Sequence, residues 1–255
     1  MRFASLGSGS KGNALLVEVN TTRILVDCGF GLAEATRRLA RLGVVPHDLA
    51  GIIVTHEHED HIGGVARFAR KHGVPVWLTT GTLRGLEGLF DTELDVCLIR
   101  GYIAFSIGDV SIEPFPVPHD AREPAQFVFS DGTRRLGLLT DAGHVTVHMQ
   151  RCLNACDALF LECNHDAEML RVGDYPERLK ARIASRFGHL DNEAAAALLA
   201  GVDQSRLQHV VAAHLSESNN RPDLARNSLA AALGCAADWI AVADQQAGLD
   251  WRQIA

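Results

Sequence analysis

A dense cluster of potential metal ligands stands in the first quarter of the chain. Three histidines and an aspartate, namely His56, His58, Asp60 and His61, directly follow the apolar run Gly51–Thr55. Neutral imidazole is a good ligand for zinc, manganese or iron, and a carboxylate can complete the coordination shell. A loop that leaves the end of a strand can turn such side chains toward one point. A solvated polar turn, the alternative, does not account for so many histidines beside acids at the end of a strand.

Three more residues of the same types follow apolar runs later in the chain, namely His119, Asp141 and His214. Taken alone, the first would be a surface histidine, the second a turn aspartate and the third a histidine at a strand end. Their order after the first cluster favours a shared metal site. His144 and His148 follow Asp141 in a helix-like stretch, and nothing in the pattern requires them as ligands.

The bulk composition is that of an ordinary water-soluble protein. The chain has 255 residues, of which 47% are hydrophobic and 22% charged, and we expect residues 1–255 to form one α/β domain. The formal net charge of -7 excludes an overall basic footprint for nucleic acid, although bound cations can create a local one. We predict no signal peptide and no membrane segment, and therefore a cytoplasmic protein. The six scattered cysteines are predicted to be reduced thiols.

Apolar runs and helical periodicity predict the elements that must position these residues. Strands are expected in these segments: Arg2–Leu6, Ala14–Val19, Arg23–Val26, Gly51–Thr55, Tyr102–Ser106, Val110–Val117, Gln126–Ser130, Arg134–Thr140, Ala158–Leu161, Leu207–Ala213 and, as the last strand, Trp239–Ala243. Helices are expected in these segments: Leu32–Leu42, Ile62–His72, Pro176–Phe187, Asn192–Leu199 and Pro222–Leu233. This order suits two sheets that are covered by helices on their outer faces.

The pattern His-x-His-x-Asp-His after a strand ending in Val-Thr resembles the signature of the metallo-β-lactamase superfamily. The resemblance extends along the chain. Asp27, within Leu-Val-Asp-Cys-Gly, is similar to the aspartate of the first motif, which buttresses the metal loop. His119, Asp141 and His214 are similar to the later metal ligands of the superfamily. This resemblance implies an α/β fold, the four-layer αββα sandwich of the metallo-β-lactamase type.

The resemblance also implies how the ligands divide between two divalent ions, with zinc expected and manganese as the alternative. One ion would be held by His56, His58 and His119. The other would be held by Asp60, His61 and His214. Asp141 and a hydroxide would bridge the ions, and Asp60 would help to aim the hydroxide at the substrate.

Further motifs resemble the YycJ (WalJ) branch of bacterial proteins, which is linked to 5′-to-3′ exonuclease activity on DNA. The branch is similar to ribonuclease Z and to a cyclic phosphodiesterase of phosphonate breakdown. These motifs are Ser8–Asn13, Glu162–Asp166, Gly188–Asn192 and His214–Asn220. His189 matches a histidine that those phosphodiesterases use near the leaving oxygen, which needs a proton or a counter-charge. The alternative is a histidine beside a helix start, with Asp191 or Asn192 as the cap.

Four residues of these motifs have open roles. Asn164 and His165 line the substrate side of the site or support metal ligands from behind. Ser8 and Asn13 lie in a Gly-rich turn, where they either donate hydrogen bonds to a phosphate or stabilise the turn itself.

We therefore expect a dimetal phosphodiester hydrolase, a 5′-to-3′ exonuclease with DNA as its partner and no membrane contact. The oligomeric state stays open. The alternative is a small-molecule hydrolase on the same scaffold, namely a cyclic phosphodiesterase, a glyoxalase II-type thioesterase or a lactonase, because fold does not fix substrate. A flavodiiron-type redox protein is disfavoured, because such sites usually replace a histidine of the first cluster by a carboxylate, and His58 and His61 are both intact.

Overall fold

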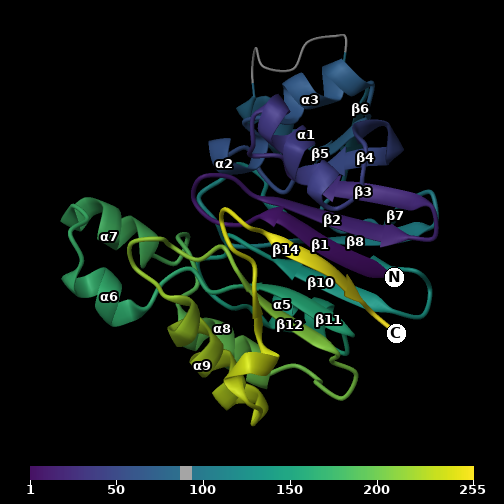
Figure 1. The fold of residues 1–255 in the computed structure, drawn as a ribbon. Coiled ribbons are helices and arrows are strands. Elements are labelled where there is room, and N and C mark those ends of the chain that lie inside the picture. The colour runs from purple at the N-terminus through teal and green to yellow at the C-terminus, as the bar shows by residue number, and fades with distance from the viewer. Residues whose placement is uncertain (87–93) are drawn as a thin grey trace.

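The computed structural model describes residues 1–86 and 94–255, and in this part of the chain two seven-stranded sheets pack face to face (Figure 1). The first sheet has the order β14-β1-β2-β3-β4-β5-β6. Its strands are β1 (Arg2–Gly7), β2 (Ala14–Val19), β3 (Thr22–Val26), β4 (Leu49–Ile53), β5 (Val76–Thr79), β6 (Val96–Ile99) and β14 (Leu249–Gln253). The pairs β3–β4, β4–β5 and β5–β6 are parallel, and the other pairs of this sheet are antiparallel.

The second sheet has the order β13-β12-β11-β10-β9-β8-β7. Its strands are β7 (Phe105–Ile107), β8 (Val110–Pro116), β9 (Ala125–Ser130), β10 (Arg135–Leu139), β11 (Ala158–Glu162), β12 (His209–Ala213) and β13 (Ala241–Val242). Strands β10 to β13 are parallel to one another, whereas β7 to β10 pair antiparallel. In both sheets, parallel strands therefore present their carboxyl ends at a common edge, which is where ligands bind in α/β proteins.

Three apolar clusters account for the four layers. One lies between the sheets and joins Phe3 and Ile24 of the first to Phe127 and Phe160 of the second. A second packs the outer face of the first sheet against helices α1 (Leu32–Arg41) and α3 (Val65–His72). A third packs the outer face of the second sheet against α5 (Val147–Leu153), α8 (Asn192–Ala200) and α9 (Pro222–Leu233). The αββα sandwich expected from the resemblance is thus confirmed.

The remaining helices lie around the functional edge. They are α2 (Glu59–Ile62), α4 (Thr80–Gly85), α6 (Ala167–Val172) and α7 (Glu177–Ile183), and short 3₁₀ turns occupy Pro46–Asp48 and Ala237–Trp239. In Figure 1, α6 and α7 project from the sandwich on the left, away from the two chain termini. No helix among the described residues is long and apolar enough to span a membrane. The six cysteines are free thiols, of which Cys28, Cys156 and Cys163 are buried.

Most predicted elements are present, and the exceptions have local causes. The helix predicted at Ile62–His72 is interrupted by Gly63 and Gly64, so α2 and α3 are separate. The strand predicted at Tyr102–Ser106 begins only at Phe105, because the preceding residues form an exposed turn. The helix predicted at Pro176–Phe187 ends at Ile183, and the chain then turns toward the site. The strand at Trp239–Ala243 is reduced to two residues and is not the last, because β14 follows it.

Candidate metal centre

The loop after β4 is held by a buried carboxylate at the end of β3. Asp27 Oδ1 accepts a hydrogen bond from the Thr55 amide at 2.8 Å, and Asp27 Oδ2 accepts from the Thr55 hydroxyl at 2.8 Å. The ring nitrogen His61 Nδ1 lies 2.8 Å from the same Oδ2. Gly29 permits the adjoining loop to pass closely, since a Cβ there would clash with the backbone oxygen of Asp60. Asp27 therefore buttresses the metal loop, as the resemblance implied.

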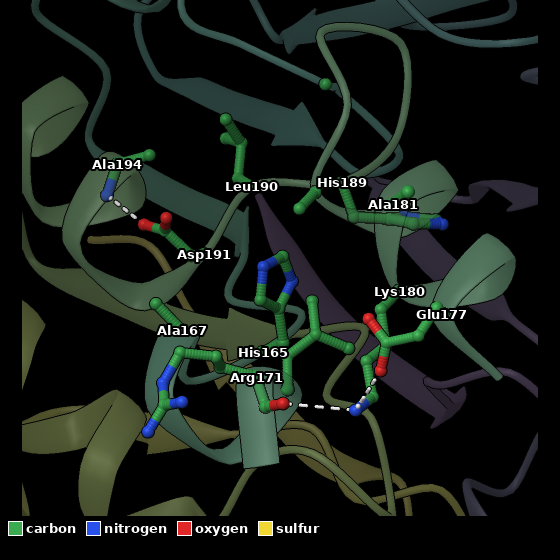
Figure 2. Close-up of a pocket in the computed structure, with 13 residues that line it drawn as sticks. His165, Ala167, Arg171, Glu177, Lys180, Ala181, His189, Leu190, Asp191 and Ala194 are labelled. Carbon is green, nitrogen blue, oxygen red and sulfur yellow. Dashed lines mark hydrogen bonds and ion pairs between the residues drawn. The ribbon is translucent and has the colours of Figure 1, made fainter. Parts of the chain in front are cut away.

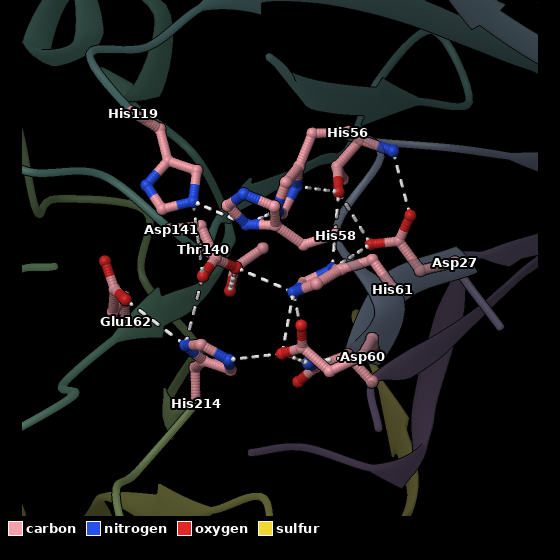
Figure 3. Close-up of polar contacts among 12 residues, drawn as sticks. Asp27, His56, His58, Asp60, His61, His119, Thr140, Asp141, Glu162 and His214 are labelled. Carbon is pink, nitrogen blue, oxygen red and sulfur yellow. Dashed lines mark hydrogen bonds and ion pairs between the residues drawn. The ribbon is translucent and has the colours of Figure 1, made fainter. Parts of the chain in front are cut away.

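Three site residues have left-handed backbone conformations where the strands end. Asp27 follows β3 with φ 61°, Asp141 follows β10 with φ 52°, and His214 follows β12 with φ 55°. Such conformations cost non-glycine residues about 1–3 kcal/mol each and persist where the surroundings enforce them. Here they turn Asp141 and His214 off the strand ends toward each other, and they turn Asp27 toward His61 (Figure 3).

Four histidines share one arrangement, in which Nδ1 faces a protein acceptor behind the ring. The acceptors are the Thr55 hydroxyl for His56 at 3.0 Å, Asp27 for His61 at 2.8 Å, the carbonyl of Gly188 for His119 at 2.9 Å and Glu162 for His214 at 3.3 Å. A proton held on Nδ1 leaves Nε2 with its lone pair. Histidines that bind metals are typically oriented by such hydrogen bonds.

The free ring nitrogens converge in the space between the sheet ends. His58 Nδ1 lies 3.0 Å from His56 Nε2 and 3.2 Å from His119 Nε2. On the other side, Asp60 Oδ2 lies 3.4 Å from His61 Nε2 and 3.3 Å from His214 Nε2. The potential ligand atoms form groups with all members within 4.8 Å of one another, among them His56–His58–His119, His56–His61–Asp141 and Asp60–His61–His214.

This donor set fits divalent cations. Nitrogens of His56, His58 and His119 face one another within 3.2 Å, and a cation bound among them could accept a lone pair from each neutral ring. Asp141 stands between the two groups, with Oδ2 at 2.9 Å from His61 Nε2 and Oδ1 at 4.0 Å from His119 Nε2. The structure thus brings together all seven residues expected as ligands, and it also places Glu162 and His189 in a donor group with Asp141 and His214.

The electrostatics of the buried donors also favour a cation. Burial, together with the neighbouring His61, lowers the pKa of His56 well below its usual value. Burial acts against ionisation of Asp60 and Asp141, yet the surrounding histidines hold the pKa of both carboxyls below the usual range. Neutral imidazole and ionised carboxylate are the forms that bind metal, so His56 and the two carboxyls already have them. His61 does not: burial opposes its charge, but Asp141 and Asp60 outweigh burial and raise its pKa well above the usual value, so a cation would have to displace its proton.

Glu162, at the end of β11, connects the two later histidines and had no assigned role in the sequence analysis. Its Oε2 accepts from the amides of Ala142 at 2.9 Å and Leu190 at 3.2 Å, and its Oε1 lies 2.8 Å from His189 Nδ1 and 3.3 Å from His214 Nδ1. An acid directly after an apolar strand, like Asp141, was the one sequence signal that could have found it.

These contacts set the charges of the cluster. Burial opposes ionisation of Glu162, but His189 and His214 hold its pKa at about 2. Burial likewise opposes charge on His189, but Glu162 and Asp141 outweigh it and raise its pKa to about 10. Burial also opposes charge on His214, but Asp141 outweighs burial and raises the pKa of His214 to about 9.

A cavity of about 390 Å³ opens onto the donors and is lined by Asp60, Asp141, His189 and His214. Helix α7 supplies its outer wall, including Arg182. Arg182 Nε donates to Asp120 Oδ2 at 2.6 Å, and this guanidinium is a cation beside the cavity that sequence analysis did not single out. Its position on α7, outside all the motifs, carried no signal.

The structure separates the residues with open roles. Asn164 Nδ2 donates to the carbonyl of His214 at 3.0 Å, so it supports that ligand from behind. Ser8 Oγ accepts from the His214 amide at 2.8 Å, and Asn13 Nδ2 donates to Asp60 Oδ2 at 3.2 Å. These contacts give both residues of the turn a structural duty. His165 instead lines a different cavity, as Figure 2 shows.

Two histidines expected to be uninvolved lie apart from the donors, since neither His144 nor His148 belongs to any donor group among the described residues. His144 Nδ1 faces the carbonyl of Arg186 at 2.9 Å. Asp191 caps α8, because its Oδ1 accepts from the Ala194 amide at 2.6 Å. The capping interpretation of this motif is correct for Asp191, and it coexists with the placement of His189 at the cavity.

Comparisons with known proteins agree with this geometry. A family model for the β-lactamase superfamily domain matches residues 22–214. Exodeoxyribonuclease YycJ of Bacillus anthracis is 40% identical over 91% of this chain and 89% of its own length. Exodeoxyribonuclease WalJ of Streptococcus pneumoniae is 35% identical over 98% of this chain and 92% of its own length. The metallo-β-lactamase fold protein YhfI of Bacillus subtilis superposes with a TM-score of 0.77 at 16% identity, over 99% of both chains, which shows the shared fold.

Proposed function

Because the chain belongs to the metallo-β-lactamase superfamily, in the branch of its YycJ and WalJ relatives, we propose that it is a metal-dependent nuclease that degrades DNA from a strand end. The observation that carries the proposal is the near-complete overlap with two relatives named exodeoxyribonucleases. We assign 5′-to-3′ polarity, and we propose that residues 1–255 form one domain.

Seven side chains are proposed to hold two divalent ions, with zinc expected and manganese as the alternative. His56, His58 and His119 hold one ion. The other ion is held by Asp60, His61 and His214, and Asp141 is shared between the two ions. When bound, the two ions supply Lewis acidity that activates water and neutralises charge on the phosphate. Nitrogen and oxygen ligands without cysteine suit both metals.

His189 is proposed to act at the leaving oxygen. Its Nδ1 is held 2.8 Å from Glu162 Oε1, which leaves Nε2 as the nitrogen available to the substrate in the cavity that His189 lines. A departing alkoxide is a strong base, and a positioned acid that protonates it accelerates such steps by about 10²–10⁴-fold. Glu162 does not touch the substrate in this scheme, and it positions the ring.

Two further residues of the cavity bind or orient the reactants. Asp60 lines the cavity and is proposed to orient the attacking water. Arg182 lines the same cavity, and its guanidinium is proposed to bind a non-bridging phosphate oxygen. Its ion pair with Asp120 keeps it at the cavity wall before substrate binds. Arginine is well suited to phosphate because its planar group offers several donors in a fixed geometry.

The test is a side-by-side assay of purified protein loaded with zinc or manganese. The substrates are bis-p-nitrophenyl phosphate, DNA labelled at either end, RNA and a glutathione thioester. We expect hydrolysis of the phosphodiester, release of mononucleotides from the 5′ end of DNA, and about two metal ions per chain by elemental analysis. Faster hydrolysis of the thioester than of any phosphodiester would instead support the small-molecule hydrolase.

A further inference from the structure

A second cavity, of about 370 Å³, is lined by residues of α7 and by His189 (Figure 2). Ala181 and Ala184 line this cavity, whereas Leu179 and Arg182 line the cavity at the metal centre. Residues three apart share one face of a helix, so α7 turns a different face to each cavity. His189 belongs to the lining of both. The second cavity is therefore continuous with the proposed site of proton transfer.

The walls of the second cavity are largely apolar. They are formed by Leu170 of α6, by Leu190, by Ala194 of α8, by Ala181 of α7 and by Ala184, which directly follows α7. The imidazole of His165 stands among these residues (Figure 2), and its Nδ1 lies 3.3 Å from Asn164 Oδ1, which fixes the plane of the ring. Apolar walls with a few placed polar groups, in a volume of about 300–1,000 Å³, are typical of small-molecule sites.

The rim of the second cavity carries two cations, Arg171 and Lys180, and two acids, Glu177 and Asp191. The Arg171 guanidinium is also paired with Glu168, at 2.6 and 2.7 Å. Lys180 Nζ donates to the carbonyl of Arg171 and to Glu177 Oε1, both at 3.0 Å, so the lysine lies across the rim, with only 14% of its side chain exposed. Arg171 lines the same rim. An aromatic base suits the walls, and a phosphate suits the rim, so the lining matches a single nucleotide.

The position of His189 decides which nucleotide this is. In an in-line displacement at phosphorus, the leaving oxygen departs on the side opposite the attacking water. If His189 protonates that oxygen, the sugar that carries it must lie beyond His189, where the second cavity opens. A cavity that holds one nucleotide there also explains cleavage at a strand end in preference to cleavage within a strand.

We propose that the second cavity binds the terminal nucleotide that the enzyme releases, with its base between Leu170, Leu190 and His165 and its 5′-phosphate at Arg171 and Lys180. This inference rests on the proposed function. The oxygen of water bonds to phosphorus, the bond from phosphorus to O3′ breaks, and O3′ takes a proton from His189, which the proton lost by the water later restores. The released nucleotide keeps its 5′-phosphate and gains a 3′-hydroxyl.

The test is a substitution that fills the cavity, Ala181→Phe, with Ala231→Phe as its control. Both alanines are exposed helical residues, but Ala231 lies on α9 and lines neither cavity. Single-turnover rates are measured on a 5′-phosphorylated oligonucleotide and on bis-p-nitrophenyl phosphate, whose leaving group is not a nucleotide. We expect the loss for Ala181→Phe to be about tenfold or more greater on the oligonucleotide, the scale of one base-stacking contact. The control should match the wild type on both substrates.

A second measurement covers the case in which Ala181→Phe fails to fold. A deoxynucleoside 5′-monophosphate, dCMP, should inhibit hydrolysis of bis-p-nitrophenyl phosphate by the wild type, and Ala184→Phe should raise the inhibition constant about tenfold or more. Equal losses on both substrates, or inhibition that Ala184→Phe leaves unchanged, would overturn the inference while the wild type still degrades DNA. A wild type that does not cleave DNA would overturn the proposed function and this inference with it.

Discussion

The two sheets contribute to the metal centre through the same device, a buried carboxylate at the end of a strand, but they use it differently. Asp27, at the end of a strand of the first sheet, accepts hydrogen bonds from the loop after β4 and contacts one histidine, His61. Glu162, in the second sheet, contacts two histidines, His189 and His214, and accepts hydrogen bonds from the amides of two loops. Asp27 therefore fixes ligands only, whereas Glu162 joins a ligand to the residue proposed for proton transfer.

This difference separates binding from reactivity in the molecule. The first sheet supplies a preformed set of donors, whose rings are held by Asp27 and by the Thr55 hydroxyl. The second sheet also supplies the cavity walls, through the segment between β11 and β12 that contains α6, α7 and His189. We expect substitutions behind the first sheet to act mainly on metal affinity, and those behind the second to act also on how the rate depends on the leaving group.

The largest expected effect is that of Asp141→Ala, because Asp141 stands between the two donor groups and faces histidines of both. We expect activity to fall to background and the affinity for both ions to weaken. Elemental analysis after dialysis, with activity on bis-p-nitrophenyl phosphate, measures both. His144→Ala is the matched control, since His144 lies outside the donor groups among the described residues. If the two variants behaved alike, the placement of Asp141 at the junction would be wrong.

The next effect is that of His189→Ala, which tests reactivity alone. The variant should keep both ions and its fold, yet lose about 10²–10⁴-fold in rate on DNA. The loss should shrink on p-nitrophenyl esters, because a good leaving group needs little protonation. Single-turnover rates on a short oligonucleotide avoid limits from product release.

The control for His189 is His148→Ala, which changes a histidine outside the cavity linings described above. It should leave both rates unchanged. An equal loss on both substrates in His189→Ala would indicate phosphate binding by His189. Loss of metal in that variant would place His189 among the ligands and remove the distinction between His189 and His214.

The sequence alone indicated the residues that the structure brings together at this edge, because they stand in short motifs at strand ends. That these residues bind metal stays a prediction. Three of the ligands fall beside His56, and the later ones each follow an apolar strand that local alternation makes visible. Glu162 has the same position, but its role depends on His189 and His214, which reach it only through the fold. A hub residue of this kind is defined by partners distant in sequence, and no spacing rule could identify it.

The overall fold was predictable from the resemblance, but the short outer strands of the first sheet were not. Helix α9 matches its predicted bounds, and β9 and β11 lie within one residue of theirs. The short strands β5 and β6 were missed because four residues carry too little periodicity. Strand β14, with the sequence Leu-Asp-Trp-Arg-Gln, has only two apolar residues, and it pairs with β1 at the other end of the chain. That residues 1–255 form one domain stays a prediction.

A smaller effect is expected from the two supporting carboxylates, and it tests the comparison directly. In Asp27→Asn and Glu162→Gln, an amide nitrogen would face hydrogen-bond donors that the carboxylate now accepts. Loss of such supporting contacts typically costs about 10–100-fold in metal affinity or activity. Rates on a series of aryl phosphodiesters at saturating metal measure what remains.

The two variants should differ in kind. Asp27→Asn should require more metal but keep the wild-type dependence of rate on leaving-group pKa. Glu162→Gln should change that dependence even at saturating metal, because His189 loses its support. An unchanged dependence in Glu162→Gln would mean that Glu162 acts only through His214, and the two halves would then use their carboxylates in the same way.

The smallest expected effect is on the salt dependence of DNA binding. It tests whether DNA lies on the half of the molecule that is formed by the second sheet and its helices. The cations beside the cavities, Arg171, Lys180 and Arg182, come from α6 and α7 of the second half, whereas the net charge of the chain is -7. Each phosphate that a cationic side chain neutralises adds about 0.7 to the salt slope on single strands and about 0.9 on duplex DNA. We therefore expect a shallow slope of about -2 to -3 for the logarithm of the binding constant against that of the salt concentration.

Lys180→Gln should reduce that slope by about 0.7–0.9, whereas Arg67→Gln, which removes an exposed cation of α3 in the first half, should leave it unchanged. Binding is measured by fluorescence anisotropy of a labelled oligonucleotide at several salt concentrations, with calcium present to limit cleavage. A steep slope that Arg67→Gln reduces would place DNA across the first sheet's helices. The four proposed ligands of the first sheet would then share their side of the molecule with the substrate-binding surface, contrary to the separation of binding from reactivity argued from Asp27 and Glu162.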